Sequence, residues 1–152
     1  MKTETTQIET YPNATAFHAG PWSELNQYVA DIPLAGSLPG KLWLKEHLGL
    51  SGMEISFGAM PPGVSIPFLH KHQQNEELYL FITGTGEMLI DGEVIAVTQG
   101  SSIRVSPAAT RCWRNTGEEP LVYFVIQAKE GSLEQWTSTD GAPVSDTPVW
   151  PL

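Results

Sequence analysis

The feature that most constrains the fold of this chain is a series of short β-strand patterns that begins after residue 40 and runs to residue 127. Glycine, proline and asparagine separate these patterns, and no long segment with helical periodicity interrupts them. Strands that recur about every 8–12 residues in this way are typical of an all-β sandwich or barrel. The expected strands span residues 42–45, 53–57, 66–72, 77–83, 86–90, 94–97, 102–105, 111–114 and 121–127.

The two ends of the chain differ from this β-rich middle. We expect a largely irregular N-terminal arm over residues 1–40, because prolines break any long element there. Ser23 is a candidate cap for one short helix over residues 24–29. Residues 131–152 combine prolines with two tryptophans and predict an extended C-terminal tail. The barrel itself is expected over residues 41–130, and 152 residues suit one domain.

Composition and charge narrow the function and the compartment. Hydrophobic residues make up 41% of the chain, enough for a real core, and the net charge is −9. That charge argues against nucleic acid as a partner and against an anionic membrane, and suits a solubilising surface. The single cysteine, Cys112, excludes an intrachain disulfide, and the polar start of the chain lacks the apolar core of a signal peptide. We therefore expect a cytoplasmic protein.

Residues 78–82 predict something about assembly, because they are apolar on both faces of their strand. A strand with one solvated face alternates polar and apolar residues. Both faces of this strand should therefore be covered. The cover is the N-terminal arm, the tryptophan-bearing tail or a second subunit, and we expect a homodimer.

The candidate site centres on His70 and His72, which a strand places on one face because side chains alternate. Glu77 opens the next strand after a short turn, and Tyr79 and Phe81 share its face. Two imidazoles and a carboxylate suit iron, manganese, nickel, copper or zinc and leave positions open for a further ligand. The alternative is that the histidines are surface residues at a strand end.

The residues from Gly63 to Gly84 resemble the first motif of the cupin family. That motif is a glycine, a His-x-His, a glutamate after a short gap, and a second glycine. His70, His72 and Glu77 occupy its central positions, while Gly63 lies one residue further upstream than in the usual form. The resemblance implies that these three residues are metal ligands.

A second cupin motif follows in altered form. Gly100, Pro107 and Asn115 stand at its spacing, and Arg111 replaces the histidine that supplies the last metal ligand in metal-binding cupins. Together the two motifs cover residues 50–128. The resemblance implies an all-β, double-stranded β-helix, which is the small jelly-roll barrel of the cupins.

Arg111 divides the functional hypotheses. Arginine has no lone pair to donate and keeps its positive charge, so it would repel a metal ion placed beside it. If Arg111 lies further from the metal ion, it can bind the carboxylate or phosphate of a ligand bidentately. Beside a metal-free pocket it can pair with Glu77. A metal site with an anion-binding arginine and a metal-free polar network both remain open.

We predict a small cupin that binds a small organic molecule, with an anionic one favoured by Arg111, at a mononuclear divalent transition metal. The alternative is a metal-free, non-catalytic ligand-binding cupin. If the protein is an enzyme, a metal-dependent dioxygenase, isomerase or lyase is expected, with no catalytic residue assigned. The predicted metal ligands are His70, His72 and Glu77. The predicted ligand-binding residues are Arg111, Trp113, Tyr79, Phe81 and Asn115.

Overall fold

The computed structural model describes residues 7–33 and 36–151. It begins with two small antiparallel hairpins, so the N-terminal arm is less irregular than expected. The first pairs β1 (Ile8–Tyr11) with β2 (Ala14–Phe17), and the second pairs β3 (Val29–Ile32) with β4 (Gly36–Pro39). Between them lies a 3₁₀ helix, η2 (Trp22–Gln27), in place of the helix expected over residues 24–29. The prolines of this arm stand at turns, before the 3₁₀ helix and at the end of a strand, where a missing N–H is tolerated.

The larger sheet has five antiparallel strands in the order β10-β7-β12-β6-β5. Its strands are β5 (Lys41–Trp43), β6 (Glu54–Met60), β7 (Asn75–Thr83), β10 (Ser102–Val105) and β12 (Leu121–Lys129). A single-turn helix, α1 (Lys45–Leu48), connects β5 to β6 and ends at Gly49, which adopts a left-handed conformation with φ of 66°.

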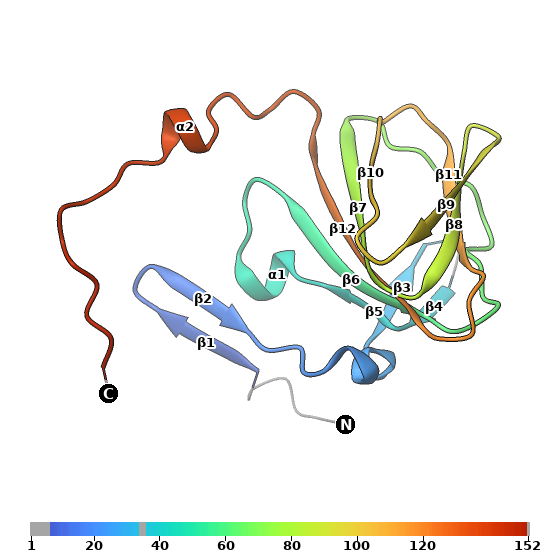
Figure 1. Cartoon of the computed structure of the whole chain (residues 1–152), viewed down its shortest axis with the longest axis horizontal. Helices are drawn as coiled ribbons and strands as arrows, with labels where there is room; N and C mark the ends of the chain where they lie inside the picture. The colour runs from blue at the N-terminus through green and yellow to red at the C-terminus, as the bar shows by residue number, and fades with distance from the viewer. Residues whose placement is uncertain (1–6, 34–35, 152) are drawn as a thin grey trace.

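The smaller sheet has the order β11-β8-β9 and faces the larger one (Figure 1). Its strands are β8 (Thr85–Ile90), β9 (Glu93–Thr98) and β11 (Arg111–Asn115). Asp91 and Gly92 join β8 to β9 with positive φ angles of 48° and 89°, as a tight hairpin requires. The predominance of strands and this two-sheet arrangement fit the double-stranded β-helix, although hydrogen bonds among the described residues do not close the sheets into one continuous barrel.

The strand predicted over residues 66–72 is not a regular strand. The segment bends at Pro67 and Phe68 and meets the smaller sheet at isolated bridges, which pair Ser65 with Arg114 and His70 with Arg111. Pro67 explains the interruption, because proline has no N–H to donate to a ladder. The segment still runs beside β11, and this position decides where its two histidines point.

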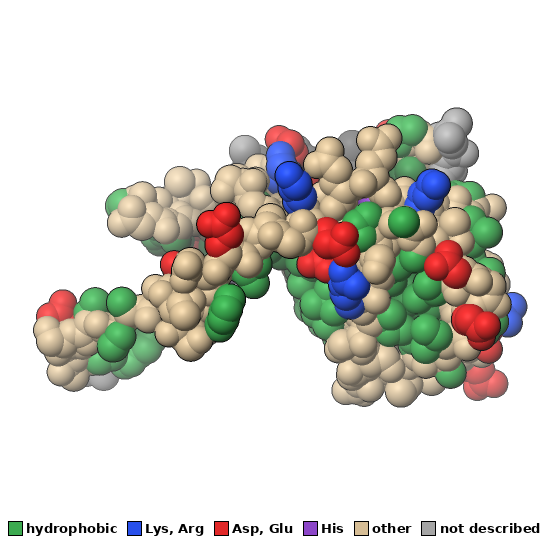
Figure 2. All heavy atoms as spheres, turned by 90° about the horizontal axis from the view of Figure 1, so that it is seen from above, with side chains coloured by type: hydrophobic (Ala, Val, Ile, Leu, Met, Phe, Trp, Pro, Cys, Tyr) green, Lys and Arg blue, Asp and Glu red, His purple; other side chains and the backbone are tan. Residues whose placement is uncertain are grey.

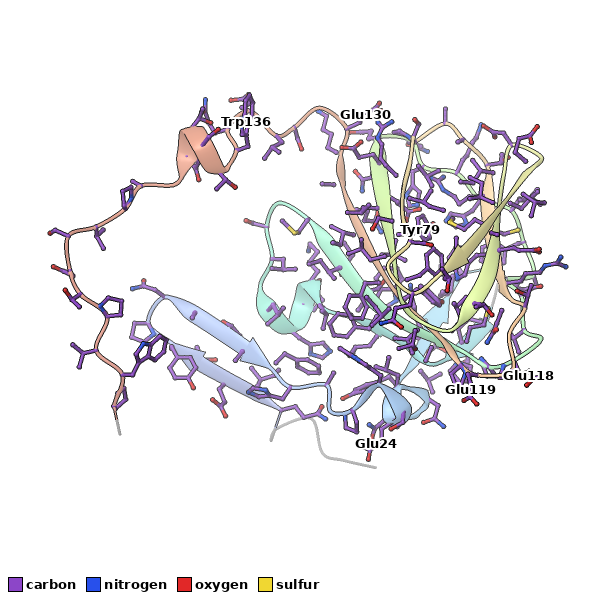
Figure 3. The ribbon with its side chains drawn as sticks, viewed as in Figure 1. Glu24, Tyr79, Glu118, Glu119, Glu130 and Trp136 are labelled. Carbon is purple, nitrogen blue, oxygen red and sulfur yellow. The ribbon has the colours of Figure 1, made fainter. Side chains whose placement is uncertain are left out.

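The space between the sheets holds the main hydrophobic core. Tyr79 and Phe81 of β7 pack there with Met88 of β8 and Trp113 of β11, and Figure 3 shows Tyr79 between the two sheets. The opposite face of the larger sheet packs against a second cluster that includes Leu25 of η2.

The N-terminal arm therefore covers at least part of the second apolar face of β7, because Ile82 packs against the cluster that holds Leu25. The homodimer that we expected as an alternative cover stays a prediction.

The C-terminal segment extends away from the two sheets and includes one single-turn helix, α2 (Thr137–Asp140). It lies on the same side as the β1–β2 hairpin in Figure 1, and both project from the body of the molecule in Figure 2. Trp136 and Trp150 are 58% and 85% exposed. Among the described residues, no helix is long and apolar enough to cross a membrane.

Candidate metal and ligand site

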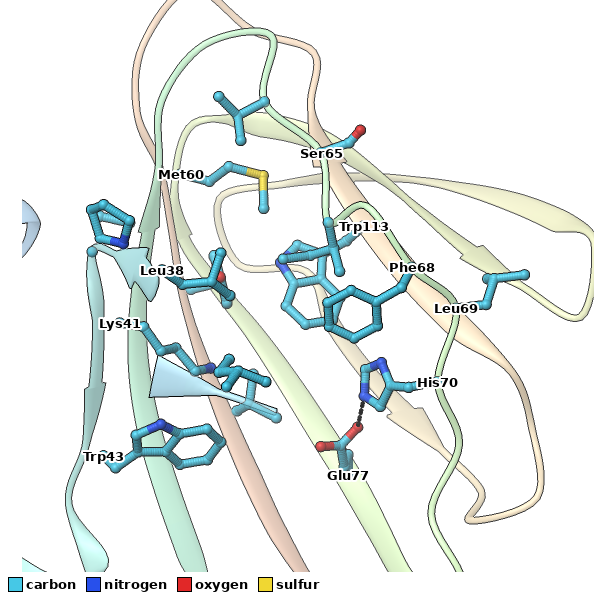
Figure 4. A pocket seen from close by; sticks show the side chains of 18 of the residues that line it. Leu38, Lys41, Trp43, Met60, Ser65, Phe68, Leu69, His70, Glu77 and Trp113 are labelled. Atoms are coloured by element: carbon cyan, nitrogen blue, oxygen red, sulfur yellow. Dashed lines mark ion pairs between the residues drawn. The ribbon is translucent and has the colours of Figure 1, made fainter. Parts of the chain in front are cut away.

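A cavity of about 730 Å³ lies at one end of the space between the sheets. Its walls come from β5, β12, the β3–β4 hairpin and the irregular segment that precedes β7. Most of the lining is apolar, and the polar side chains that join it include His72 together with Lys41, His70 and Glu77. The last three are labelled in Figure 4. A largely apolar hollow with a few converging polar groups is the usual form of a small-molecule site. Representative apolar lining residues are Leu38, Met60, Ile66, Phe68, Trp113 and Val125.

Backbone hydrogen bonds fix the two histidines at the wall of this cavity. The N–H of His70 donates to the carbonyl of Arg111 at 3.2 Å, and the N–H of Arg111 donates to the carbonyl of His70 at 2.9 Å. The N–H of His72 donates to the carbonyl of Pro107 at 2.9 Å. The segment is thus held against β11 although it is not a regular strand, and its histidines face Glu77 on β7.

The three predicted metal ligands lie together. One ligand atom from each of His70, His72 and Glu77 can be chosen so that all lie within 4.8 Å of one another. Nε2 of His72 is 3.0 Å from Oε1 of Glu77, and Nε2 of His70 is 3.9 Å from Oε2. Three converging ligands of this kind can hold one divalent transition metal and leave coordination positions open.

Two imidazole nitrogens of this group lack a hydrogen-bond partner. Nδ1 of His70 and Nε2 of His72 are buried, and neither makes a hydrogen bond within the described part of the chain. The contact between His72 and Glu77 is close but lacks the alignment of a hydrogen bond. Burial also lowers the pKa of His70, which favours the neutral form that binds metals. Buried imidazole nitrogens without a hydrogen-bond partner, beside a carboxylate, fit a transition metal.

Glu77 is held in one orientation by groups that lie behind it. Its side chain is 5% exposed, and Oε2 accepts a hydrogen bond from the Tyr79 hydroxyl at 2.5 Å. Nε of Arg111 lies 3.3 Å from the same oxygen. Burial, followed by the charge of Glu77, raises the pKa of Tyr79, so its hydroxyl stays a donor. These contacts leave Oε1 on the side of His72.

Arg111 is fully buried and does not line the cavity. Its guanidinium donates to three backbone carbonyls, those of Ser106 at 3.1 Å, Pro107 at 3.4 Å and His70 at 3.5 Å. It therefore supports Glu77 and ties together the loops around the site. The sequence predicted that Arg111 binds the anionic group of a ligand. That role stays a prediction, and the position of Arg111 outside the lining does not favour it.

Of the other predicted ligand-binding residues, one lines the cavity and three do not. Trp113 lines the cavity and is 7% exposed. Tyr79 and Phe81 are buried in the core and are not part of the lining. Asn115 donates its amide to the carbonyls of Met60 and Glu119, both at 2.8 Å, so it fastens neighbouring loops away from the lining.

Lys41 is a lining residue that sequence reasoning missed. It is 8% exposed, and its Nζ donates to Oγ of Ser56 at 2.8 Å. Burial lowers the pKa of Lys41 to about 8, although the negative charges of Glu77 and Glu54 act in the opposite direction. The only signal in the sequence is a charge in a short apolar strand pattern, and this does not reveal which face is buried.

Comparisons with known proteins place the site in a family context. The model of a family described as "Cupin domain" matches residues 56–127. A cupin protein from Bacteroides fragilis is 38% identical, with a TM-score of 0.67 over 68% of this chain and 88% of that protein. A proposed sugar phosphate isomerase from Acidithiobacillus ferrooxidans is 26% identical, with a TM-score of 0.54 over 59% of this chain and 58% of that one.

A curated relative adds a match over a shorter region. The uncharacterized protein MJ1618 from Methanocaldococcus jannaschii is 36% identical over 63 residues, or 41% of this chain. The matched region spans 50% of that relative, so this chain corresponds to about half of its length.

Proposed function

Because this chain belongs to the cupin family, we propose that it binds a small organic molecule in its cavity, at a mononuclear divalent transition metal held by His70, His72 and Glu77. The observation that carries this proposal is the convergence of three ligand atoms within 4.8 Å at the cavity wall. A bound metal there would supply Lewis acidity, which polarises a carbonyl or lowers the pKa of a water molecule.

The surrounding residues have distinct tasks in this proposal. Arg111 and Tyr79 orient Glu77 through Oε2, as supporting residues behind metal ligands commonly do. The apolar wall, which includes Phe68 and Trp113, contacts the body of the ligand and excludes water. Of the reaction classes expected for such a site, isomerisation is favoured by the likeness to a proposed sugar phosphate isomerase, as an argument from analogy.

A metal-free ligand-binding protein is the second candidate, and one observation favours it. Glu77 already has a buried cation 3.3 Å away in Arg111 and a hydroxyl donor in Tyr79, so its charge is compensated without a metal. A fixed positive charge beside the ligands also opposes the binding of a second cation. The two candidates share the cavity and differ only in whether the histidines hold a metal.

Metal analysis distinguishes the candidates. The protein is purified without chelator or metal-affinity resin, its metal content is measured by mass spectrometry, and it is titrated with Fe(II), Mn(II), Zn(II), Ni(II) and Cu(II). We expect one metal per chain, and loss of binding in His72→Ala. His18→Ala is the control, because its side chain is 65% exposed and lies outside the site. Sub-stoichiometric metal together with no binding on titration would contradict the metal proposal.

A further inference from the structure

Lys41 stands at the cavity wall as a buried ammonium group. It comes from β5, and its side chain extends into the cavity from the side opposite His70 (Figure 4). Its hydrogen-bond acceptor, Ser56, is fully buried on the adjacent strand β6. The amine is therefore held in place by the larger sheet while it faces the space that a ligand would fill.

The charge of Lys41 has no counter-ion among the residues that the structure describes. Among residues 7–33 and 36–151, no carboxylate lies within 4.0 Å of its Nζ, and Glu77 and Glu54 act only from further away. An ammonium group has three donors, and the hydroxyl of Ser56 accepts one of them. Lysine is seldom buried without a partner, because an unpaired charge in an apolar setting is unfavourable.

Aromatic rings compensate the ammonium only in part. Nζ lies 4.7 Å from the centre of the Trp43 ring and 5.6 Å from that of Tyr123. Such cation–π contacts stabilise an ion by less than the penalty of removing it from water. The pKa of about 8 reflects that uncompensated burial, and it keeps most of the amine protonated at neutral pH. An anion in the cavity would provide the missing partner.

The rest of the cavity defines what kind of anion fits. The ammonium of Lys41, whose acceptor Ser56 is outside the lining, offers few donors to a ligand. This suits a carboxylate better than a phosphate, because phosphate groups are usually held by several donors. The neighbouring walls are apolar and aromatic, with Phe68 and Trp113 between Lys41 and His70 (Figure 4). A ligand that satisfies both features has one carboxylate and an apolar body.

We propose that Lys41 is the specificity-determining residue of the cavity and that it binds the carboxylate of a small monocarboxylate whose apolar body lies against Trp113 and Phe68. This inference rests on the proposed function for the use of the cavity as a binding site, but it does not depend on the metal. It assigns the recognition of an anion to Lys41, where sequence reasoning assigned it to Arg111.

The test compares acids with their neutral amides. Hexanoate, benzoate and 4-phenylbutyrate, each beside its primary amide, are titrated by calorimetry at pH 7 into metal-free and metal-loaded protein. We expect at least one acid to bind at least about tenfold more tightly than its amide, as loss of a charge-assisted hydrogen bond predicts. Lys41→Met should abolish this preference. Lys45→Met is the matched control, because Lys45 is on the half-exposed helix α1 and should leave the preference unchanged.

The outcomes separate this inference from the proposed function. Equal binding of every acid and its amide, no binding of any acid, or a preference that survives Lys41→Met would each overturn the role of Lys41. Unchanged metal stoichiometry in Lys41→Met would show that the variant is folded and that the metal site is independent of it. If Lys41→Met does not fold, Lys41→Gln keeps the test valid, because it removes the charge and retains a hydrogen-bond donor. Acid preference without any metal binding would contradict the metal proposal alone.

Discussion

Two buried cationic side chains, Arg111 and Lys41, lie near the same cavity and differ in how far the protein compensates their charge. Arg111 is surrounded by protein acceptors, with Glu77 at 3.3 Å and three backbone carbonyls within 3.5 Å. Lys41 has one hydroxyl acceptor, two aromatic rings and no counter-ion within the described chain. Arg111 is outside the lining, whereas Lys41 is part of it.

The difference shows how to distinguish a buried charge that stabilises the fold from a buried charge that binds a ligand. A buried cation that the protein itself neutralises stabilises the arrangement around it, and its removal leaves its partner unpaired. A buried cation that faces an open cavity without a partner makes the folded protein less stable until a ligand arrives. The identity of the residue does not decide which role it takes, because arginine is the more usual anion receptor of the two.

The largest effect should come from Arg111→Met. Removing the guanidinium leaves the buried carboxylate of Glu77 without its cation. It also removes one of the donors to each of three carbonyls, which keep their backbone donors. We expect the free energy of unfolding in urea to fall by about 3–5 kcal/mol. The control is Arg114→Met, because Arg114 pairs with Glu87 at the surface and should contribute less than about 1 kcal/mol. Similar losses in the two variants would contradict the structural role of Arg111.

The same variant sharpens the choice between the two candidate functions. If Glu77 is a metal ligand, removal of the nearby cation should tighten the binding of Mn(II) or Zn(II) to whatever folded protein remains, because the electrostatic repulsion is lost. If the histidines hold no metal, the variant should lose stability and gain no metal binding. Metal titration followed by calorimetry distinguishes the two results.

Lys41 should make the stability of the protein depend on pH. Its pKa is about 8 in the folded protein and 10.5 for an unperturbed lysine side chain, so the unfolded chain binds more protons between these values. Stability from this group therefore rises as the pH increases from 8 to 10.5, by up to about 3 kcal/mol. The measurement is urea unfolding across this range, with Lys41→Met as the reference that lacks this rise. The neighbouring groups Glu77, Glu54 and His70 are present in both proteins, so only the rise between pH 8 and 10.5 is assigned to Lys41. Parallel curves for the two proteins would contradict the prediction.

Tyr79→Phe should give the smallest of these effects. The substitution removes the hydroxyl that donates to Oε2 of Glu77 and leaves the core packing of the ring. A hydrogen bond to a charged group contributes about 1.5–3 kcal/mol. We expect a loss near the lower end of that range, because Arg111 still contacts the same oxygen. The matched control is Tyr123→Phe, which also removes a buried hydroxyl from the same core, where the ring of Tyr123 packs against Trp113. Equal losses in both variants would show that the loss does not come from the hydrogen bond to Glu77.

The sequence was most informative where local spacing decides the structure. The strand pattern after residue 40 predicted a β-rich fold, and the positions of His70, His72 and Glu77 predicted a cluster that the structure brings together. It was less informative where one residue breaks a pattern. Pro67 removes a ladder donor, so the strand expected over residues 66–72 does not form, yet backbone bonds to β11 keep the histidines in place.

The role of Lys41 could not be predicted, because it depends on strand register. Lys41 pairs with Gly58 of β6, and the ring of Tyr123 packs directly over that glycine. A shift of one residue would turn Lys41 to the other face of the sheet. The pairing of Arg111 with Glu77 could not be predicted either. β7 and β11 belong to different sheets, and the distance between them is set by packing.

The most direct test of the contrast between the two cations is the titration of Lys41 by NMR of protein with isotopically labelled lysine, assigned through Lys41→Met. We predict a pKa near 8 in the ligand-free protein, and a higher value when the acid that calorimetry identifies as the tightest binder is added, because the carboxylate stabilises the ammonium form. A pKa that remains at 10.5 without ligand, or that does not change when the acid binds, would contradict the account.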